Sequence, residues 1–220
     1  MRAMILAAGR GKRLQPITDE RPKPLVELGG QPLIFYHLEG LAASGFREVV
    51  INLGYLGHLL REALEDGSRW GLNIHYSQEP EDALETGGGI ARALPMLGSA
   101  PFLVVNGDIY SDYSFGRLRA IKCSHAHLVL VPVPADKQHG DFALIQGRIH
   151  NEGQPKYTFS GISVYHPAFF ADHAGGRWSI VPLLRKTVHD HLVTGELYKG
   201  EWNDIGTVGR LEELRARKGP

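Results

Sequence analysis

The chain has 220 residues, of which 43% are hydrophobic, and this is enough for one substantial buried core. Its 24 lysines and arginines balance its 24 aspartates and glutamates, so no overall field attracts nucleic acid or an anionic membrane surface. A single cysteine, Cys123, excludes an internal disulfide framework and is typical of a reducing compartment. These properties favour one domain over residues 1–220 and argue against a protein that binds nucleic acid or membranes.

The N-terminal apolar run ends at Ala8, where the sequence continues as Gly-Arg-Gly-Lys. This run is too short for a signal peptide or a membrane-spanning helix. We therefore expect a soluble, cytoplasmic protein, and no feature of the sequence predicts an obligate protein partner.

The same run predicts a short buried strand that ends at Leu6 and is followed by a glycine-rich loop. Gly9 and Gly11 allow the backbone to turn sharply, so that its N–H groups face an anion. Pro24 biases the backbone of Lys23 toward an extended conformation. The cations near this loop are Arg10, Lys12, Arg13 and Lys23. Together they predict a triphosphate-binding loop, whereas the glycine pair alone would also fit an ordinary strand-to-loop turn.

Strands and helices alternate over the first half of the chain. Strands are predicted over residues 48–53, 73–77 and 102–106, and helices over 31–44, 56–64 and 87–94. Pro32 suits the first turn of the first helix, and Thr86 suits the cap of the third. Such alternation predicts a single-domain α/β fold with a Rossmann-like, doubly wound, mostly parallel sheet. Ligands of these sheets bind at the carboxyl ends of the strands, where the glycine-rich loop and Asp108 both fall.

Beyond residue 126 the pattern changes to strands, predicted over 127–133, 141–150 with a turn at Gly147, and 158–166. Helices return over 180–189 and 208–217. We therefore expect a smaller β-rich region that covers the open end of the sheet and shapes a second pocket.

The glycine-rich loop resembles a family signature, G-x-G-x-R-L-x-P-x-T followed by P-K-P-L, which here runs from Gly9 to Leu25. This is the signature of nucleotidyltransferases that make nucleoside-diphosphate sugars. Further segments similar to that family are LETGGGI, FLVVNGD, FSGISVY and WNDIGT, so the resemblance covers nearly the whole chain. It implies the nucleotide-diphospho-sugar transferase fold, and transfer of a nucleotidyl group from a nucleoside triphosphate to a sugar 1-phosphate with release of pyrophosphate.

The resemblance also implies roles for individual residues. Arg13 would hold the β- and γ-phosphates, and Lys23 would bridge the α-phosphate and the sugar phosphate, which makes these two residues the catalytic candidates. The nucleotide-binding candidates are Leu6, Ala8, Gly9, Gly11, Arg13, Lys23, Gln78, Glu85 and Thr86. The sugar-binding candidates are Asn106, Gly140, Asp141, Thr158 and Ser160. The candidate ligands of a Mg²⁺ ion, which is usually held by one or two carboxylates plus phosphate oxygens, are Asp108 and Asp204.

Each assignment has an ordinary structural alternative. Arg13 would otherwise be a solvated loop residue, and Asp108 and Asp204 would be turn or cap residues. The sugar-binding candidates would be ordinary turn or strand residues. Glu85 stands where the family frequently has glycine, which leaves the identity of the base open from the motif alone.

Among family members, the HGDF and FSGISVYHP segments most resemble bacterial uridylyltransferases that act on N-acetylmuramic acid α-1-phosphate in cell-wall recycling. UTP is then the expected nucleotide, and Lys156 or Arg148 would lie near the lactyl carboxylate of the sugar. The alternatives are a mannose 1-phosphate guanylyltransferase and a catalytically silent nucleotide-sensing module. A nicotinamide oxidoreductase is disfavoured, because Leu14 stands where a third glycine is needed and the loop is strongly cationic.

Overall fold

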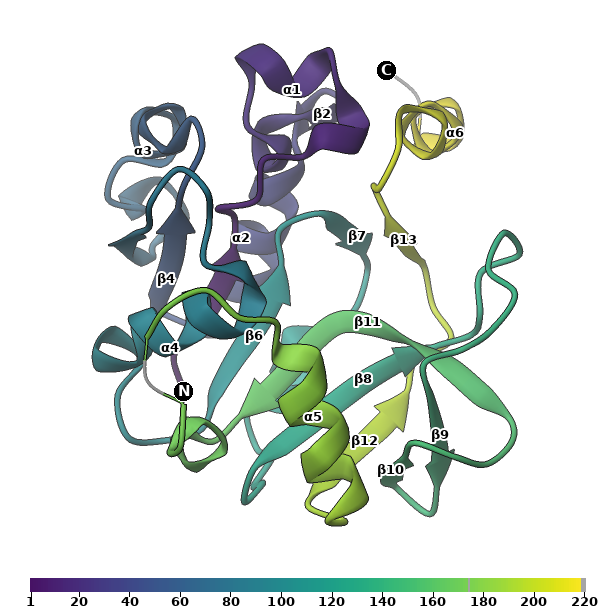
Figure 1. The fold of residues 1–220 in the computed structure, drawn as a ribbon. Coiled ribbons are helices and arrows are strands. Elements are labelled where there is room, and N and C mark those ends of the chain that lie inside the picture. Colours follow the sequence, from purple (N-terminus) through teal and green to yellow (C-terminus); the bar gives the residue numbers. More distant parts are fainter. Residues whose placement is uncertain (174, 219–220) are drawn as a thin grey trace.

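A computed structural model describes residues 1–173 and 175–218. Within these residues, nine strands form one sheet in the order β5-β4-β1-β6-β11-β8-β12-β10-β9, beside two small two-stranded sheets (Figure 1). The strands are β1 (Ala3–Leu6), β2 (Glu27–Leu28), β3 (Gln31–Pro32), β4 (Glu48–Leu53), β5 (Asn73–Gln78), β6 (Phe102–Asn106), β7 (Ile109–Ser111), β8 (Ala126–Val131), β9 (Phe142–Ile145), β10 (Arg148–His150), β11 (Lys156–Tyr165), β12 (Val193–Leu197) and β13 (Trp202–Asp204).

The α-helices are α1 (Ile17–Glu20), α2 (Leu33–Ala43), α3 (Gly57–Leu64), α4 (Glu85–Leu97), α5 (Ile180–His189) and α6 (Val208–Lys218). The short 3₁₀ helices are η1 (Lys12–Leu14), η2 (Lys23–Leu25), η3 (Ser68–Trp70), η4 (Phe115–Leu118) and η5 (Pro167–Phe170). Along the described residues, no helix combines the length and the apolar character that crossing a membrane requires.

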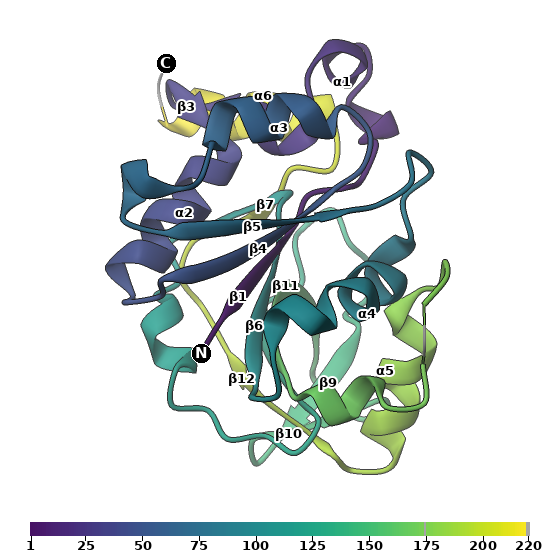
Figure 2. The ribbon, with the colours of Figure 1, turned by 90° about the vertical axis from the view of Figure 1, so that its left-hand side faces the viewer.

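The N-terminal half of the sheet is parallel and is buried on both faces. Strands β5, β4, β1 and β6 are parallel neighbours, so their carboxyl ends meet at one edge. Ile5 of β1 packs in the core formed with α2 and α3, whereas its neighbour Met4 packs in the core formed with α4 and α5. This alternation follows from the two-residue period of a strand. Figure 2 shows the result, with α2 on one side of the strands and α4 and α5 on the other.

The C-terminal half of the sheet curls on itself. Strand β11 pairs antiparallel with both β6 and β8, and it also pairs with β9, so that β11, β8, β12, β10 and β9 form a closed ring. The β9–β10 hairpin turns at Gln146 and Gly147 with positive φ angles of 49° and 74°, as a two-residue hairpin loop requires. The predicted turn at Gly147 is thus confirmed. The sheet as a whole is mixed, so the expectation of a mostly parallel sheet is wrong beyond β6, where every described strand pair except β8–β12 is antiparallel.

Local predictions were correct where apolar periodicity decides the structure and wrong where tertiary contacts decide it. Strand β4 and helix α5 have the predicted bounds. Helix α4 begins at Glu85, and Thr86 makes no cap, because the Gly87 and Gly88 N–H groups both donate to the Trp178 carbonyl. Pro32 lies before α2, where it pairs in β3. Elements that the sequence did not predict are α1, β2, β3, β7, β12 and β13.

Candidate active site

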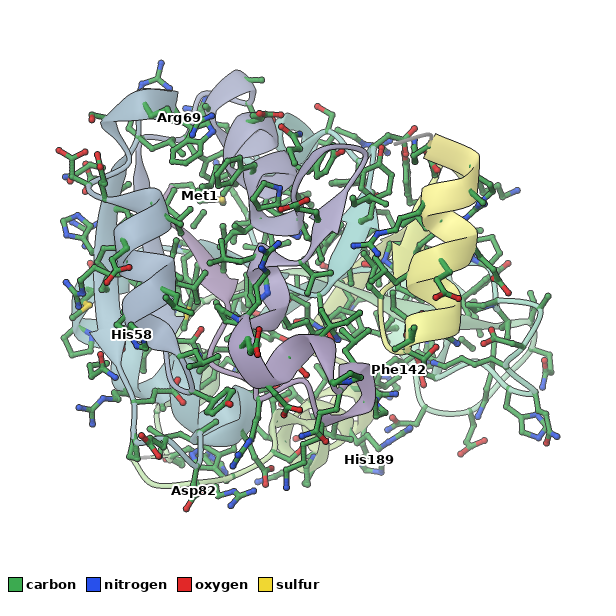
Figure 3. All side chains as sticks on the ribbon, turned by 90° about the horizontal axis from the view of Figure 1, so that it is seen from above. Met1, His58, Arg69, Asp82, Phe142 and His189 are labelled. Carbon is green, nitrogen blue, oxygen red and sulfur yellow. The ribbon has the colours of Figure 1, made fainter. Side chains whose placement is uncertain are left out.

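A cavity of about 340 Å³ opens where the carboxyl ends of β1, β4 and β6 meet. The sequence-predicted residues on its wall are Leu6, Ala8, Gly9, Gly11, Arg13, Lys23, Glu85, Thr86, Asn106 and Asp108. The other lining residues are Ala7, Lys12, Pro24, Asn52, Glu79, Ala83, Gly107 and Gly206. Figure 3 looks down on this edge of the molecule, with α3 and His58 on one side and α6 on the other.

The glycine-rich loop has the shape that an anion site needs. Gly11 has a φ of 66°, a left-handed conformation that costs glycine little, and η1 begins directly after it. The Thr18 hydroxyl donates to the Gly11 carbonyl over 2.9 Å, and Leu14 is fully buried beneath the loop. The loop is therefore anchored from inside, while the side chains of Lys12 and Arg13 remain exposed.

Lys23 is buried to 8% exposure, and its Nζ lies 2.7 Å from Oδ2 of Asp108. Its backbone begins the 3₁₀ helix η2, so the expectation of an extended conformation is wrong. Hydrogen bonds from Leu25 N to Pro22 O and from Val26 N to Lys23 O stabilise this turn, and they outweigh the bias from Pro24. The result is a lysine ammonium group held at the cavity wall beside a carboxylate.

The two predicted metal-ligand aspartates lie on neighbouring segments, although 95 residues separate them in sequence. Strands β7 and β13 pair antiparallel with Asp204 opposite Ile109, and the Ile205 N–H donates to the Asp108 carbonyl over 2.8 Å. Their side chains are 39% and 33% exposed, so both carboxylates can reach a ligand. Asp108 lines the cavity, whereas Asp204 lines a second cavity beside it, and only the nearby Gly206 reaches the first cavity wall.

Gly206 leaves open the space between Arg13 and Asp204. A methyl group built on this glycine would lie 3.4 Å from Arg13 Nη1 and 3.4 Å from Asp204 Oδ2. The guanidinium of Arg13 and Oδ2 of Asp204 therefore both lie beside Gly206, and Arg210 Nη1 would lie 3.6 Å from the same methyl group. A bound phosphate would need a cation such as Arg13 at this place, and a divalent metal ion would need a carboxylate such as Asp204.

Sequence reasoning missed a buried polar pair under the loop. Asn52 Oδ1 accepts from the Ala7 N–H over 2.7 Å, and Asn52 Nδ2 donates to Glu79 Oε1 over 2.6 Å. The other Glu79 oxygen accepts from the Leu84 N–H over 2.8 Å. The two residues thereby fix the loops after β1 and β5 relative to strand β4. The signal was an asparagine inside the otherwise apolar EVVINL run.

The predicted base-side residues divide between the cavity and the surface. Glu85 and Thr86 line the cavity, whereas Gln78 is exposed and donates to the Glu79 carbonyl over 3.0 Å. Glu85 has a φ of 60°, which explains why a glycine suits this position. Its carboxylate lies 3.3 Å from Nε of Arg177.

Among the predicted sugar-side residues, Asn106 lines the cavity, Thr158 and Ser160 lie on β11, and Gly140 and Asp141 lie in the loop before β9; the last four belong to the closed ring of β8–β12 and its loops, called the β-ring below. Asp141 Oδ2 accepts from the Phe159 N–H over 2.9 Å, and the Ser160 hydroxyl donates to the Val129 carbonyl over 2.7 Å. Thr158 is 2% exposed, and its hydroxyl has no partner among the described residues. At Gly140, a methyl group would come within 2.6 Å of the Lys156 backbone, so a close approach of two chains requires glycine.

The expected cations for a sugar carboxylate also lie outside the cavity wall. Arg148 is on β10 and donates to the His191 carbonyl over 3.0 Å, and Lys156 begins β11 with its Nζ 3.5 Å from Glu152. The structure thus brings Arg13, Lys23, Asp108 and Asn106 together and separates them from these two residues.

A divalent metal fits the donor set only with help from a substrate. Among residues 1–173 and 175–218, no three side chains of histidine, cysteine, aspartate or glutamate form a metal cluster. Asp108 and Asp204 supply two carboxylates, each held by a cation, Lys23 or Arg210. Mg²⁺ commonly takes one or two carboxylates and completes its shell with phosphate oxygens and water, so this pair suits a Mg²⁺ ion that arrives with a nucleotide.

The model of the nucleotidyl transferase family matches residues 2–218, so the chain belongs to this family. The chain is 46% identical over 228 residues to N-acetylmuramate alpha-1-phosphate uridylyltransferase of Neisseria meningitidis serogroup B, covering 100% of this chain and 99% of that protein. It is 30% identical over 226 residues to mannose-1-phosphate guanylyltransferase catalytic subunit beta of Danio rerio, covering 94% and 61%. The inositol-1-phosphate CTP transferase from T. maritima has the same fold, with a TM-score of 0.80, 20% identity, and coverage of 99% and 95%.

Proposed function

We propose that this chain transfers the uridylyl group of UTP to N-acetylmuramic acid α-1-phosphate, forming UDP-N-acetylmuramic acid and releasing pyrophosphate. The observation that carries the proposal is the cavity in which Lys23, Asp108 and the cationic glycine-rich loop meet at the strand ends. The choice of substrates rests on the full-length similarity to the Neisseria meningitidis uridylyltransferase. The place of the reaction would be the recycling of cell-wall sugars in the cytoplasm.

The reaction is a displacement at phosphorus. An oxygen of the sugar phosphate forms a bond to the α-phosphorus of UTP, and the bond from that phosphorus to the bridging oxygen breaks, so that pyrophosphate leaves. Lys23 lies in the cavity wall, where its ammonium group would neutralise both the α-phosphate and the incoming phosphate. Arg13 would bind the β- and γ-phosphates through its planar fork. Preorganised charges of this kind lower the barrier of phosphoryl-type transfers.

Asp108 and Asp204 would hold the Mg²⁺ ion that accompanies the triphosphate. A bound Mg²⁺ ion would supply charge neutralisation at the phosphate oxygens. In the chain itself, the ion pairs with Lys23 and Arg210 orient the two carboxylates until that cation arrives. This scheme needs no general base for the sugar phosphate, because a phosphate monoester is largely ionised near neutral pH.

The two halves of the sheet would divide the work of recognition. The parallel half, as a Rossmann-like, doubly wound unit, would bind UTP through the first loop and the segment that contains Gln78, Glu85 and Thr86. The β-ring would carry the sugar-binding surface with Gly140, Asp141, Thr158 and Ser160, which faces the acceptor beside Asn106. Residues 1–220 would then act as one nucleotidyltransferase domain.

The test is product formation from the two proposed substrates. We expect ³¹P NMR to show pyrophosphate and a nucleotide sugar when the purified protein is mixed with UTP, N-acetylmuramic acid α-1-phosphate and Mg²⁺. The Lys23→Ala variant, purified in the same way, controls for contaminating enzymes. Pyrophosphate from GTP and mannose 1-phosphate alone would favour the guanylyltransferase alternative. Nucleotide binding without turnover of any pair would favour a nucleotide-sensing module.

A further inference from the structure

Arg210 of α6 joins two aspartates that come from distant segments of the chain. Its Nη1 donates to Asp204 Oδ1 on β13. Its Nε donates to Asp136 Oδ2 over 3.0 Å, and its Nη2 donates to the same oxygen. Asp136 belongs to the loop between β8 and β9, which in Figure 1 rises beside β13 toward α6.

The bridge divides the two oxygens of Asp204 between two tasks. Oδ1 accepts from Arg210 Nη1, whereas Oδ2 lies beside Gly206, a residue of the candidate active-site wall. A planar guanidinium presents five donors in a rigid fork, so it can hold two carboxylates at once in fixed directions. The side chains of Arg210 and Asp204 are 26% and 33% exposed, so their contact is better shielded than an ordinary surface pair, whereas Asp136 is 58% exposed.

The other end of the bridge holds the loop that leads to the sugar-side residues. Asp136 lies four residues before Gly140 and five before Asp141. A second cavity, of about 900 Å³, separates this loop from β13 and α6, and Asp136, Asp204 and Arg210 all line it. The hydrogen bonds between Asp136 and Arg210 therefore connect the loop directly to α6 at the wall of this cavity.

We propose that Arg210 is a positioning residue that couples the metal-binding carboxylate to the acceptor-binding loop. One arm orients Asp204 so that Oδ2 stays free for the cation, and the other holds the loop over residues 132–141 in place for the sugar 1-phosphate. This inference rests on the proposed function, because it takes Asp204 as a metal ligand and the loop as part of the acceptor site.

The two arms can be separated by substitution. Asp136→Asn removes the charge from the loop arm and leaves the Asp204 arm intact. We expect it to raise the KM for the sugar 1-phosphate about tenfold, because the two hydrogen bonds from Arg210 would then go to a neutral acceptor instead of a carboxylate. The KM for UTP and the Mg²⁺ concentration at half-saturation should stay within about twofold of the parent values. Arg210→Gln removes both arms and should raise the sugar KM and the Mg²⁺ concentration at half-saturation together. Arg210→Lys keeps the charge but not the planar fork, so its Mg²⁺ concentration at half-saturation should lie between those of the parent and of Arg210→Gln.

Hydrogen exchange provides a readout that does not depend on turnover. Amides of residues 132–141 should exchange faster in Asp136→Asn and Arg210→Gln than in the parent. Asp190→Asn, which removes one exposed negative charge after α5, is the matched control and should change neither exchange nor kinetics. Unchanged exchange in this loop, or an unchanged sugar KM in Asp136→Asn, would overturn the coupling. If the parent turns over no substrate pair while the two variants still show faster exchange in this loop, the proposed function is contradicted and the bridge itself is supported.

Discussion

Lys23 is 8% exposed, and lysines are rarely buried this deeply unless they are paired. Asp108 supplies that pair at 2.7 Å, so the ammonium group is already in place before any phosphate binds. Holding a charge where negative charge gathers in the reaction is the most effective way in which a protein lowers this kind of barrier.

The Lys23→Ala variant tests this role. We expect turnover to fall about 10²- to 10³-fold, or roughly 3 to 4 kcal/mol, because one preorganised charge contact is lost. The fold should remain, since the Asp108 side chain is 39% exposed and becomes hydrated. Lys122→Ala, at an exposed lysine, is the control and should match the parent in steady-state pyrophosphate release. Activity of Lys23→Ala within about threefold of the parent would rule out the proposed role.

Gly206 provides a second test at a single residue, because its missing side chain leaves space beside Arg13 and Asp204. An added methyl group would lie in ordinary contact with Arg13 and Asp204, and Gly206 does not adopt a positive φ, so Gly206→Ala should fold normally. The methyl group would occupy space that a phosphate or a cation needs. We expect kcat/KM to fall by about 10- to 100-fold, since small misplacements at a reacting centre are costly.

Gly209→Ala is the matched control for that substitution. Gly209 lies in α6, and a methyl group there would meet nothing within 4 Å. This variant should keep full activity and gain up to about 1 kcal/mol of stability from better helix propensity. Equal kcat/KM for Gly206→Ala and Gly209→Ala would show that the space beside Arg13 is not used.

At the scale of elements, the sequence predicts what apolar periodicity determines. The buried runs of β4 and β6 and the amphipathic pattern of α5 are legible residue by residue. Strands β7 and β13 have three residues each and exist because they pair with one another, although residues 112–201 lie between them in sequence. No local pattern encodes such a pairing, so the family signature predicted Asp108 and Asp204 as partners, whereas Arg210 and the Asn52–Glu79 pair were missed.

Helix α2 carries a buried histidine whose pKa predicts a pH dependence of stability. Burial lowers the pKa of His37 to about 4, and this outweighs the opposing effects of Asp108 and of a hydrogen bond to the Ile109 backbone. In the unfolded chain the imidazole has its ordinary pKa of 6.5. The unfolded state therefore binds more protons between pH 6.5 and about 4, so stability falls as the pH falls through this window.

Urea unfolding at pH 7 and pH 5 measures this effect. From His37 alone we expect the parent to lose about 2 kcal/mol of unfolding free energy between these two pH values. His37→Gln cannot take up a proton, so it should lose that much less over the same interval, although it is less stable at pH 7. An identical pH dependence of parent and variant would show that His37 is not buried in its neutral form.

At the scale of the whole molecule, the site forms where two differently built halves meet. Strand β11 joins them by pairing antiparallel with β6 on one side and with β8 on the other. The alternation of strands and helices predicted the parallel half, but the closing contact between β9 and β11 was not predictable from local sequence. Of the predicted sugar-side residues, only Asn106 consequently lies on the cavity wall with Lys23 and Asp108, whereas Gly140, Asp141, Thr158 and Ser160 lie outside it.

Metal dependence tests the fold of the whole molecule, because the two candidate ligands, Asp108 and Asp204, come from distant parts of the chain. Three phosphates of UTP and one of the acceptor converge, and the cations of Arg13 and Lys23 do not balance their charge. Chelation with EDTA should abolish turnover, and added Mg²⁺ should restore it. Asp108→Asn and Asp204→Asn should each raise the Mg²⁺ concentration needed for half-maximal rate, with Asp190→Asn as the control. An unchanged Mg²⁺ titration in either variant would exclude that aspartate as a ligand.

The central claim concerns the pair of substrates that this cavity joins. The most direct measurement is kcat/KM for pyrophosphate release over a grid of UTP and GTP against N-acetylmuramic acid α-1-phosphate and mannose 1-phosphate. We predict that UTP with N-acetylmuramic acid α-1-phosphate exceeds every other pair by at least about tenfold, or about 1.4 kcal/mol of transition-state preference. A preference of the same size for GTP with mannose 1-phosphate would contradict the substrate assignment, and no release from any pair would contradict the proposed reaction itself.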